Sequence, residues 1–219
     1  MGDPGIVQLR KPASSVGVGL KRVRINLGWS PAATGSETIF DLDLSCLILN
    51  ENGRMVSAKD LIFYGNRISS DGSVVHSTDD VSGSRSDGGP DEWIDLDLFF
   101  LSRSVRAILF VVSVYNHDYS KVSLGDLSNV FIQIKNDLTQ AEIHHKEIEG
   151  AHFDGKRCLE IGSLVRTEEQ WEFVMRGITH SRGLEAVIEL YSDLNCEYEV
   201  PTEAPIIDMN ATNIRRPQK

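Results

Sequence analysis

Carboxylates gather in one short stretch of the sequence. Eight acids lie between Asp71 and Asp97, against a single base, Arg85. The centre of this stretch, residues 79–92, is also rich in Gly and Ser, which is typical of a loop. Clustered carboxylates repel one another at neutral pH and oppose folding. A calcium ion, which takes about six to eight oxygen ligands, would offset that repulsion, whereas a charge run without an ion is typical of a solvated face.

Two predicted strands beside this loop each carry an Asp-x-Asp pattern. Asp41 and Asp43 alternate with apolar residues in one strand, and Asp95 and Asp97 repeat the arrangement in the other. Side chains two residues apart in a strand point to the same face, so each pair of carboxylates is about 7 Å apart. The pattern is typical either of a calcium cup or of two strands with polar outer faces.

Composition narrows the class of protein. The chain has 219 residues, a formal net charge of −10, 41% hydrophobic and 25% charged residues, which indicates a globular protein. The acidic balance argues against nucleic acid as the main partner, because phosphate binding needs a basic face. No run approaches the roughly 18 apolar residues of a membrane-spanning helix, and the first residues lack the apolar core of a secretory signal. We therefore expect a cytoplasmic protein.

Period-two hydrophobic patterns dominate the chain. They predict an all-β fold, an antiparallel β-sandwich of two sheets with a few short helices. A single domain is expected over residues 1–192, followed by a flexible C-terminal tail over 193–219. The predicted strands are 22–27, 40–49, 61–64, 74–76, 93–98, 105–115, 127–135, 142–148, 158–166 and 171–177, and the one good helix candidate is 183–190.

Signatures of catalysis are missing from the sequence. The six His residues have no metal-ligand spacing, and there is no nucleophile elbow, phosphate loop or dinucleotide fingerprint. The three widely spaced Cys residues are interpreted as small buried hydrophobes in a reducing compartment. So many acids on one loop match ion binding better than the two-carboxylate mechanism of a glycosidase. We expect a protein that is not an enzyme.

Several collinear motifs carry a resemblance to a known family. They are 25–29 (Ile-Asn-Leu-Gly-Trp), 40–45 (Phe-Asp-Leu-Asp-Leu-Ser), 49–53 (Leu-Asn-Glu-Asn-Gly), 61–66, 70–76, 124–132 and 160–173. In this order they resemble the TerD family of tellurium-resistance and general-stress calcium-binding proteins. The resemblance covers roughly residues 17–192 and implies a calcium-binding β-sandwich.

The resemblance also implies a ligand set. The implied calcium ligands are Asp41, Asp43, Asp79, Asp80, Asp91 and Glu92, with Asn66 and Asp71 as second-rank candidates. The loop departs from the family pattern, because Thr78-Asp79-Asp80 stands where Gly-Asp-Asn is usual and Pro90 where an acid is usual. Arg85 brings a positive charge close to the cup, which disfavours a second cation.

Together these features predict a non-enzymatic, calcium-binding stress or tellurite-resistance protein that acts as an ion-dependent interaction module. Its expected partners are calcium and proteins of a stress-response complex, with no nucleic acid and no direct membrane insertion. The alternative is a metal-free scaffold whose acidic loop docks a partner. A calcium-dependent membrane-surface module is a third interpretation, disfavoured because the acidic loop carries only one apolar residue, Val81.

Overall fold

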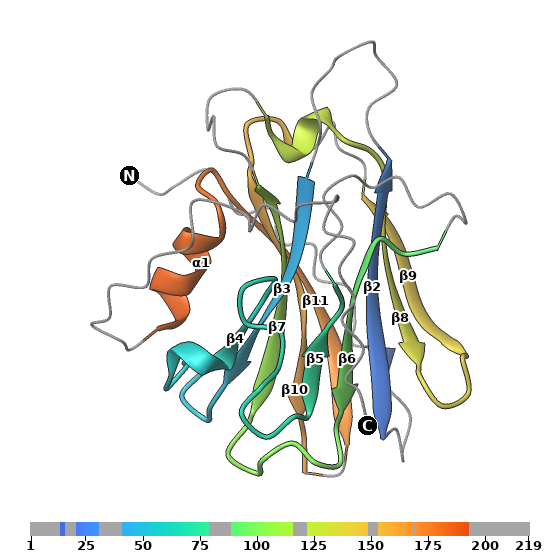
Figure 1. The fold of residues 1–219 in the computed structure, drawn as a ribbon, viewed down its shortest axis with the longest axis vertical. Coiled ribbons are helices and arrows are strands. Elements are labelled where there is room, and N and C mark those ends of the chain that lie inside the picture. Colours follow the sequence, from blue (N-terminus) through green and yellow to red (C-terminus); the bar gives the residue numbers. More distant parts are fainter. Residues whose placement is uncertain are drawn as a thin grey trace, which may run out of the picture.

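A computed structural model describes residues 14–15, 21–30, 41–78, 89–115, 122–148, 153–168 and 170–192. Its strands form two antiparallel sheets, drawn in Figure 1. One has the order β1-β11-β10-β7-β3-β4, built from β1 (Ser14–Ser15), β11 (Trp171–His180), β10 (Cys158–Arg166), β7 (Ala107–Tyr115), β3 (Asp41–Leu49) and β4 (Leu61–Ile62). The other has the order β5-β6-β2-β8-β9, built from β5 (Val74–His76), β6 (Glu92–Asp97), β2 (Arg22–Ser30), β8 (Ser128–Asn136) and β9 (Glu142–Ile148).

The main core lies between the two sheets. Alternate residues of the central strands point into it, such as Ile25 of β2, Leu44 of β3 and Phe110 of β7, each with no exposed surface. Because side chains alternate across a strand, the period-two pattern of the sequence places one face of each of these three strands in this core. The all-β sandwich expected from the sequence is confirmed.

A second apolar cluster covers part of the outer face of the six-stranded sheet. The helix α1 (Leu184–Tyr191) contributes Leu184 and Val187, which join Leu47 of β3 and Leu109 of β7. β7 is therefore buried on both faces, which explains its uninterrupted apolar sequence. Two short 3-10 helices complete the described elements, η1 (Ala58–Asp60) and η2 (Leu124–Asp126). Among the described residues, no helix is long and apolar enough to cross a membrane.

The observed elements differ from the expected ones mainly at their ends. The strand predicted over 61–64 stops at Ile62, because Phe63 and Asn66 exchange backbone hydrogen bonds of 3.1 and 3.0 Å and close a turn. The strand predicted over 171–177 continues to His180 in β11, although Gly177 has a φ of 71°. The predicted helix is shifted by one residue.

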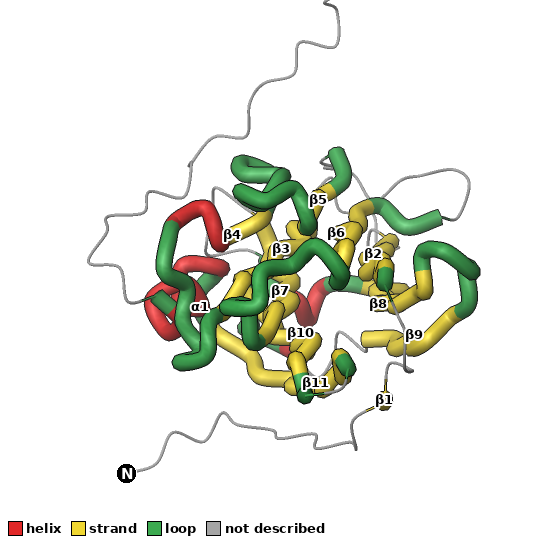
Figure 2. Tube along the Cα trace, turned by 90° about the horizontal axis from the view of Figure 1, so that it is seen from below, coloured by secondary structure: helices red, strands yellow, loops and turns green. Residues whose placement is uncertain are grey.

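The sandwich has two chemically different ends. At the acidic end, which holds Asp41 and Asp91, β3 and β6 begin and β2 finishes. At the loop end, Asp97 of β6 lies beside Arg22 of β2, and residues 98–106 lead from β6 to β7. The loop end is at the bottom of Figure 1, and Figure 2 looks onto it from below.

Candidate metal site

Asp41 and Asp43 lie where β3 begins at the acidic end. Leu42 and Leu44 belong to the core between the sheets, so alternation places the two Asp residues on the outer face of the six-stranded sheet. Asp43 is 5% exposed and Asp41 is half-buried. Their neighbours in register on β7 are Ser113 and Tyr115, which carry hydroxyl groups. The structure thus brings two carboxylates and two hydroxyl-bearing side chains to one end of the sheet.

Asp91 and Glu92 lie at the same end, where β6 begins. The Trp29 amide of β2 donates to Oδ2 of Asp91 at 2.9 Å, and the Asp91 amide donates to the Leu27 carbonyl at the same distance. Oε2 of Glu92 reaches across to the other sheet and accepts from the Leu44 amide at 2.7 Å. The Asp91 and Glu92 carboxylates therefore hold the backbones of β2 and β3. These hydrogen bonds also restrict the movement of the carboxylate oxygens that could bind a metal ion.

His76 of β5 completes the link between the sheets. Its Nε2 lies 2.7 Å from the Leu44 carbonyl oxygen, and its Nδ1 lies 2.8 Å from the Ser77 carbonyl oxygen. Carbonyl oxygens only accept hydrogen bonds, so both ring nitrogens donate, which is the arrangement of an imidazolium ion. The matching negative charge is Oε2 of Glu92, 3.7 Å from Nε2. His76 and Glu92 are 2% and 0% exposed, so with the imidazole protonated this contact is a buried ion pair.

The His76–Glu92 pair explains how the edge of β3 is closed. β4 pairs with β3 only at Cys46 and Leu47, so the Leu44 amide and carbonyl extend beyond that short strand. Glu92 and His76 satisfy both groups and replace a missing stretch of strand. Sequence reasoning did not find His76 as a functional residue. The sequence carries one signal for His76. It lies two residues after Val74 on a short strand, so both side chains share the buried face, and a buried histidine needs hydrogen-bond partners.

Asn66 lies away from the acidic end. Its amide nitrogen donates to the Leu61 carbonyl at 2.7 Å and approaches the Lys59 carbonyl at 3.4 Å. Leu61 pairs with Leu47, near the end of β3 that is opposite to Asp41. The Asn66 side chain therefore points away from the carboxylates and stabilises the turn after β4.

Asp71 lies at the loop end. Its Oδ1 accepts from the Ser73 amide at 3.0 Å and from the hydroxyl groups of Ser73 and Ser69 at 2.5 and 2.7 Å. Partial burial would raise the pKa of Asp71, but the hydrogen bonds from Ser73, Ser69 and Ser102 outweigh it and lower the pKa below its usual value. Since β5 and β6 separate this turn from Asp91, Asp71 is not brought to the other carboxylates.

Asp79 and Asp80 lie outside the described residues. The described neighbours of segment 79–88 are Thr78, after β5, and Gly89, before β6, and both flanks are at the acidic end. Within the part of the chain that the structure describes, no three His, Cys, Asp or Glu side chains converge on a possible metal position. The described donors are oxygens of the type that calcium prefers, but they do not form a complete coordination shell by themselves.

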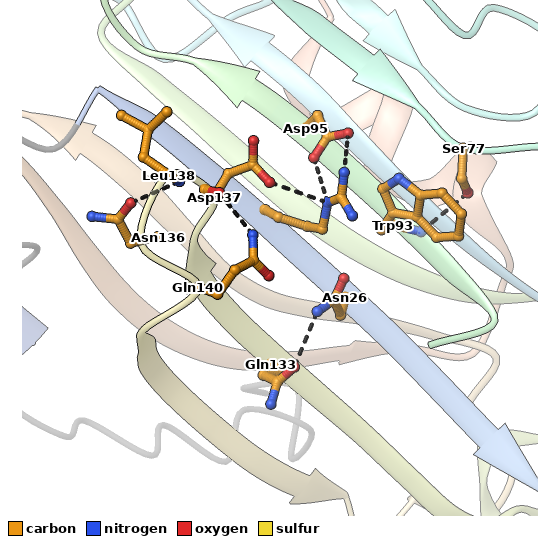
Figure 3. A network of polar contacts seen from close by, with 10 residues as sticks. Asn26, Ser77, Trp93, Asp95, Gln133, Asn136, Asp137, Leu138 and Gln140 are labelled. Carbon is orange, nitrogen blue, oxygen red and sulfur yellow. Dashed lines mark hydrogen bonds and ion pairs between the residues drawn. The ribbon is translucent and has the colours of Figure 1, made fainter. Parts of the chain in front are cut away.

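The second Asp-x-Asp strand has a different environment. Asp95 of β6 faces Arg24 of β2 in register, and the guanidinium binds both carboxylate oxygens at 2.6 and 2.8 Å (Figure 3). The hydrogen bond to Asp95 raises the pKa of Arg24. Asp97 is paired with Arg22 at 3.2 Å. The polar network around Arg24 also includes Asp137, 3.8 Å away. Arginine side chains are therefore the counter-ions of Asp95 and Asp97, and these two carboxylates do not belong to the candidate metal site.

A second buried carboxylate, Glu160, lies under α1 on the outer face of the six-stranded sheet. It is 1% exposed and contacts His180 at 2.9 Å, Arg176 at 3.4 Å and the Tyr191 hydroxyl at 2.9 Å. Burial, then the charge of Glu160, raises the pKa of Tyr191 to about 12. Burial also raises the pKa of the neighbouring Cys158 thiol, which therefore stays protonated and unreactive. The cluster ties α1 to β10 and β11, and sequence reasoning missed it.

Known proteins resemble this chain over most of its length. A model of the TerD domain matches residues 7–191. The tellurium resistance protein TerD of Serratia marcescens is 34% identical over 188 residues, which cover 85% of this chain and 93% of that protein. General stress protein 16U of Bacillus subtilis is 30% identical over 173 residues, covering 79% and 88%.

A solved structure has the same fold. The crystal structure of a TerD homologue from Streptomyces coelicolor superposes with a TM-score of 0.63 at 20% identity, covering 78% of this chain and 96% of that one. The family match extends from before β1 to the last residue of α1 and so includes both sheets. With the family model and the relatives in agreement, this chain belongs to the TerD family.

Proposed function

We propose that this protein binds calcium at its acidic end. The observation that carries the proposal is that four carboxylates, Asp41, Asp43, Asp91 and Glu92, lie at the same end of the sandwich, where two strands from different sheets begin. The segment between β5 and β6 has both described flanks at the same end and supplies Asp79 and Asp80 in the sequence. We propose these six residues as ligands, without Asn66 and Asp71, whose side chains are held elsewhere.

The proposed role is that of a non-enzymatic, cytoplasmic interaction module in stress or tellurite resistance. Its relatives support the biological setting, because they carry the names tellurium resistance protein and general stress protein. The chemistry of the described residues supports a role other than catalysis, since Cys46 and Cys158 are buried thiols with raised pKa values. Calcium would order the acidic end and so create or withdraw a surface for protein partners.

Thermal unfolding in calcium and in chelator tests the proposal. Ligand that binds only the folded state stabilises it by mass action, so millimolar calcium should raise Tm by several degrees, about what 1–3 kcal/mol produces in a domain of this size. Hydrogen exchange should slow in residues 78–92 in the same samples. Equal melting curves and equal exchange in calcium and in chelator would argue against a calcium site.

A metal-free scaffold is the second candidate function. It is favoured by the hydrogen bonds that already engage Asp91 and Glu92, and by the absence of a three-ligand cluster among the described residues. In that case the acidic end docks a partner through its charge alone. The variant Asp79→Ala separates the two functions, whereas Glu92→Ala would also remove the buried contacts with Leu44 and His76. Equal loss of partner binding by Asp79→Ala with and without chelator supports the scaffold.

A further inference from the structure

Two aromatic side chains project from the loop end. Phe99 and Phe100 are 75% and 69% exposed, and their rings pack edge to face with centroids 5.6 Å apart. Leu138, in the neighbouring turn between β8 and β9, is 60% exposed. The Leu98 amide bonds to the Lys21 carbonyl and the Asp137 amide to the Arg22 carbonyl, so the two loops flank the start of β2. Adjacent exposed aromatics on one loop indicate a contact surface.

The loop that carries the two Phe residues is held in place by buried side chains and backbone hydrogen bonds. Leu98, Leu101 and Val105 anchor it in the core, with exposed fractions of 6%, 4% and 8%. Oδ1 of Asp97 accepts from the Phe99 amide at 3.1 Å, and the Asp97 carbonyl accepts from the amides of Phe100 and Leu101. The aromatic rings therefore face solvent because the apolar anchors of the loop turn them outward.

Arginine side chains surround the same loop. Arg103 and Arg106 are exposed and make no ion pair with any described residue. Arg166 of β10 donates to the carbonyls of Leu101 and Ser102 at 3.2 and 3.1 Å. The Arg166 amide donates to the Arg106 carbonyl at 2.9 Å, and burial, then the charges of Arg103 and Arg106, lower the pKa of Arg166. In a chain of net charge −10 this is a local basic cluster.

Two acids at this end of the sandwich are already engaged by other groups. Asp97 is paired with Arg22 at 3.2 Å, and Asp71 is held by the hydroxyl groups of Ser69 and Ser73. Neither is available to neutralise Arg103 and Arg106 without losing these contacts. The basic cluster therefore fits an anionic surface outside the molecule.

We propose that the loop end docks on an anionic lipid bilayer, with Phe99, Phe100 and Leu138 entering the interfacial region and Arg103 and Arg106 binding headgroup phosphates. Aromatic side chains bury favourably at the boundary between headgroups and acyl chains, and each basic residue near an anionic surface adds to the attraction. We favour a lipid surface over a folded partner, because exposed apolar side chains on two separate loops, Phe99 and Phe100 on one and Leu138 on the other, lie beside exposed arginines.

This inference differs from the expectation drawn from the sequence. That expectation considered only the acidic loop, where Val81 is the single apolar residue, and predicted no direct membrane insertion. The docking proposed here is peripheral and uses the opposite end of the molecule. It does not rest on the calcium proposal, so the two fail or succeed separately.

Flotation of the full chain with lipid vesicles tests the docking. In chelator, the protein should float with vesicles of phosphatidylglycerol and phosphatidylcholine, and much less with phosphatidylcholine alone. Phe99→Ser with Phe100→Ser should weaken the partition at least about tenfold, because two aromatic side chains lose their burial. Arg103→Gln with Arg106→Gln should weaken it about fivefold or more, and raised salt should do the same to the unaltered chain.

Leu190→Ser is the matched control, because Leu190 is 54% exposed on α1, which covers the outer face of the six-stranded sheet. It should float like the unaltered chain, and all variants should keep the same melting temperature. The proposal is overturned if the unaltered chain does not float with anionic vesicles, if it floats equally with neutral ones, or if the Phe variant floats normally. Sedimentation that shows a dimer broken by the Phe variant, with no flotation, would assign this surface to a second copy of the chain.

Discussion

β3 and β6 carry the same Asp-x-Asp pattern, yet the structure gives the two pairs different surroundings. Asp95 and Asp97 on β6 face Arg24 and Arg22 across the ladder and form ion pairs with them. Asp41 and Asp43 on β3 face Tyr115 and Ser113, which bring no positive charge. Identical alternation along a strand thus leads to a protein-supplied counter-ion in one case and, in our proposal, to ligands for a metal ion in the other.

The difference shows that register decides what a carboxylate on a strand does. A cross-strand neighbour lies about 5 Å away, close enough to neutralise a charge, whereas residues two apart on the same strand only share a face. The pairing partner of Asp95 lies 71 residues away in the chain, so the counter-ion is set by topology and is invisible to local spacing.

The largest effect on stability is expected at Glu92, which joins β6 to β3. Glu92→Gln keeps an acceptor for the Leu44 amide but removes the charge opposite the His76 imidazolium. Breaking one side of a buried ion pair costs about 3–5 kcal/mol, so the variant should be strongly destabilised in urea unfolding with chelator present. The exposed pair of Glu142 and His145, 3.6 Å apart, offers the control.

Glu142→Gln removes the same charge from a Glu–His pair on the surface. The side chains are 49% and 39% exposed, so solvent screens the interaction and the loss should stay within about 0.5 kcal/mol. Similar losses for Glu92→Gln and Glu142→Gln would contradict the assignment of a buried imidazolium–carboxylate pair.

The second-largest effect is expected for calcium binding when the two Asp residues of β3 are changed. Asp41→Asn with Asp43→Asn should weaken calcium binding about tenfold or more, because two charged ligands become neutral. The stability of the same variant in chelator is the baseline against which its calcium response is compared. Calcium titration followed by Tm measures both, and an unchanged calcium response would remove these residues from the ligand set.

The pair on β6 should behave in the opposite way. Asp95→Asn with Asp97→Asn should lower the free energy of unfolding by about 1–2 kcal/mol, mostly through the bidentate contact with Arg24. Its calcium affinity should equal that of the unaltered chain. A loss of calcium binding in this variant, measured beside the β3 variant, would erase the distinction between the two strands.

The smallest effect is expected at Asp71. Asp71→Asn should cost about 0.5 kcal/mol or less at neutral pH, because the turn is largely exposed, and should leave calcium binding unchanged. The lowered folded-state pKa means that the charged form adds stability above the ordinary pKa of an Asp. That contribution disappears as the pH falls through the lowered pKa, so the stability difference between variant and unaltered chain should vanish in strong acid.

The fold was largely predictable from local patterns. Alternating apolar residues located a strand such as β6 within one residue, because burial of one strand face leaves a direct record in the sequence. The end of β4 was not predictable, since it depends on a turn closed by the Asn66 side chain against Leu61. Tertiary hydrogen bonds of this kind have no periodic signal.

The site was predictable in part. Type and order in the sequence selected Asp41, Asp43, Asp91 and Glu92 as candidate ligands, and the fold brings their strands to one end, while calcium binding by them stays a prediction. The buried His76 was missed, because its partner Leu44 is 32 residues earlier and acts through its backbone carbonyl. The aromatic–basic loop end was also missed, because Phe99 and Phe100 follow a strand and resemble core residues until their exposure is known.

Calorimetric titration of the unaltered, chelator-stripped chain with calcium tests the central claim most directly. The account predicts saturable binding that the Asp41→Asn, Asp43→Asn variant weakens and the Asp95→Asn, Asp97→Asn variant leaves intact. Magnesium at the same concentrations should bind far more weakly, because it holds its waters and avoids crowded carboxylate cages. No heat of binding with the unaltered chain, or the same loss of binding in both variants, would contradict a calcium site at the acidic end.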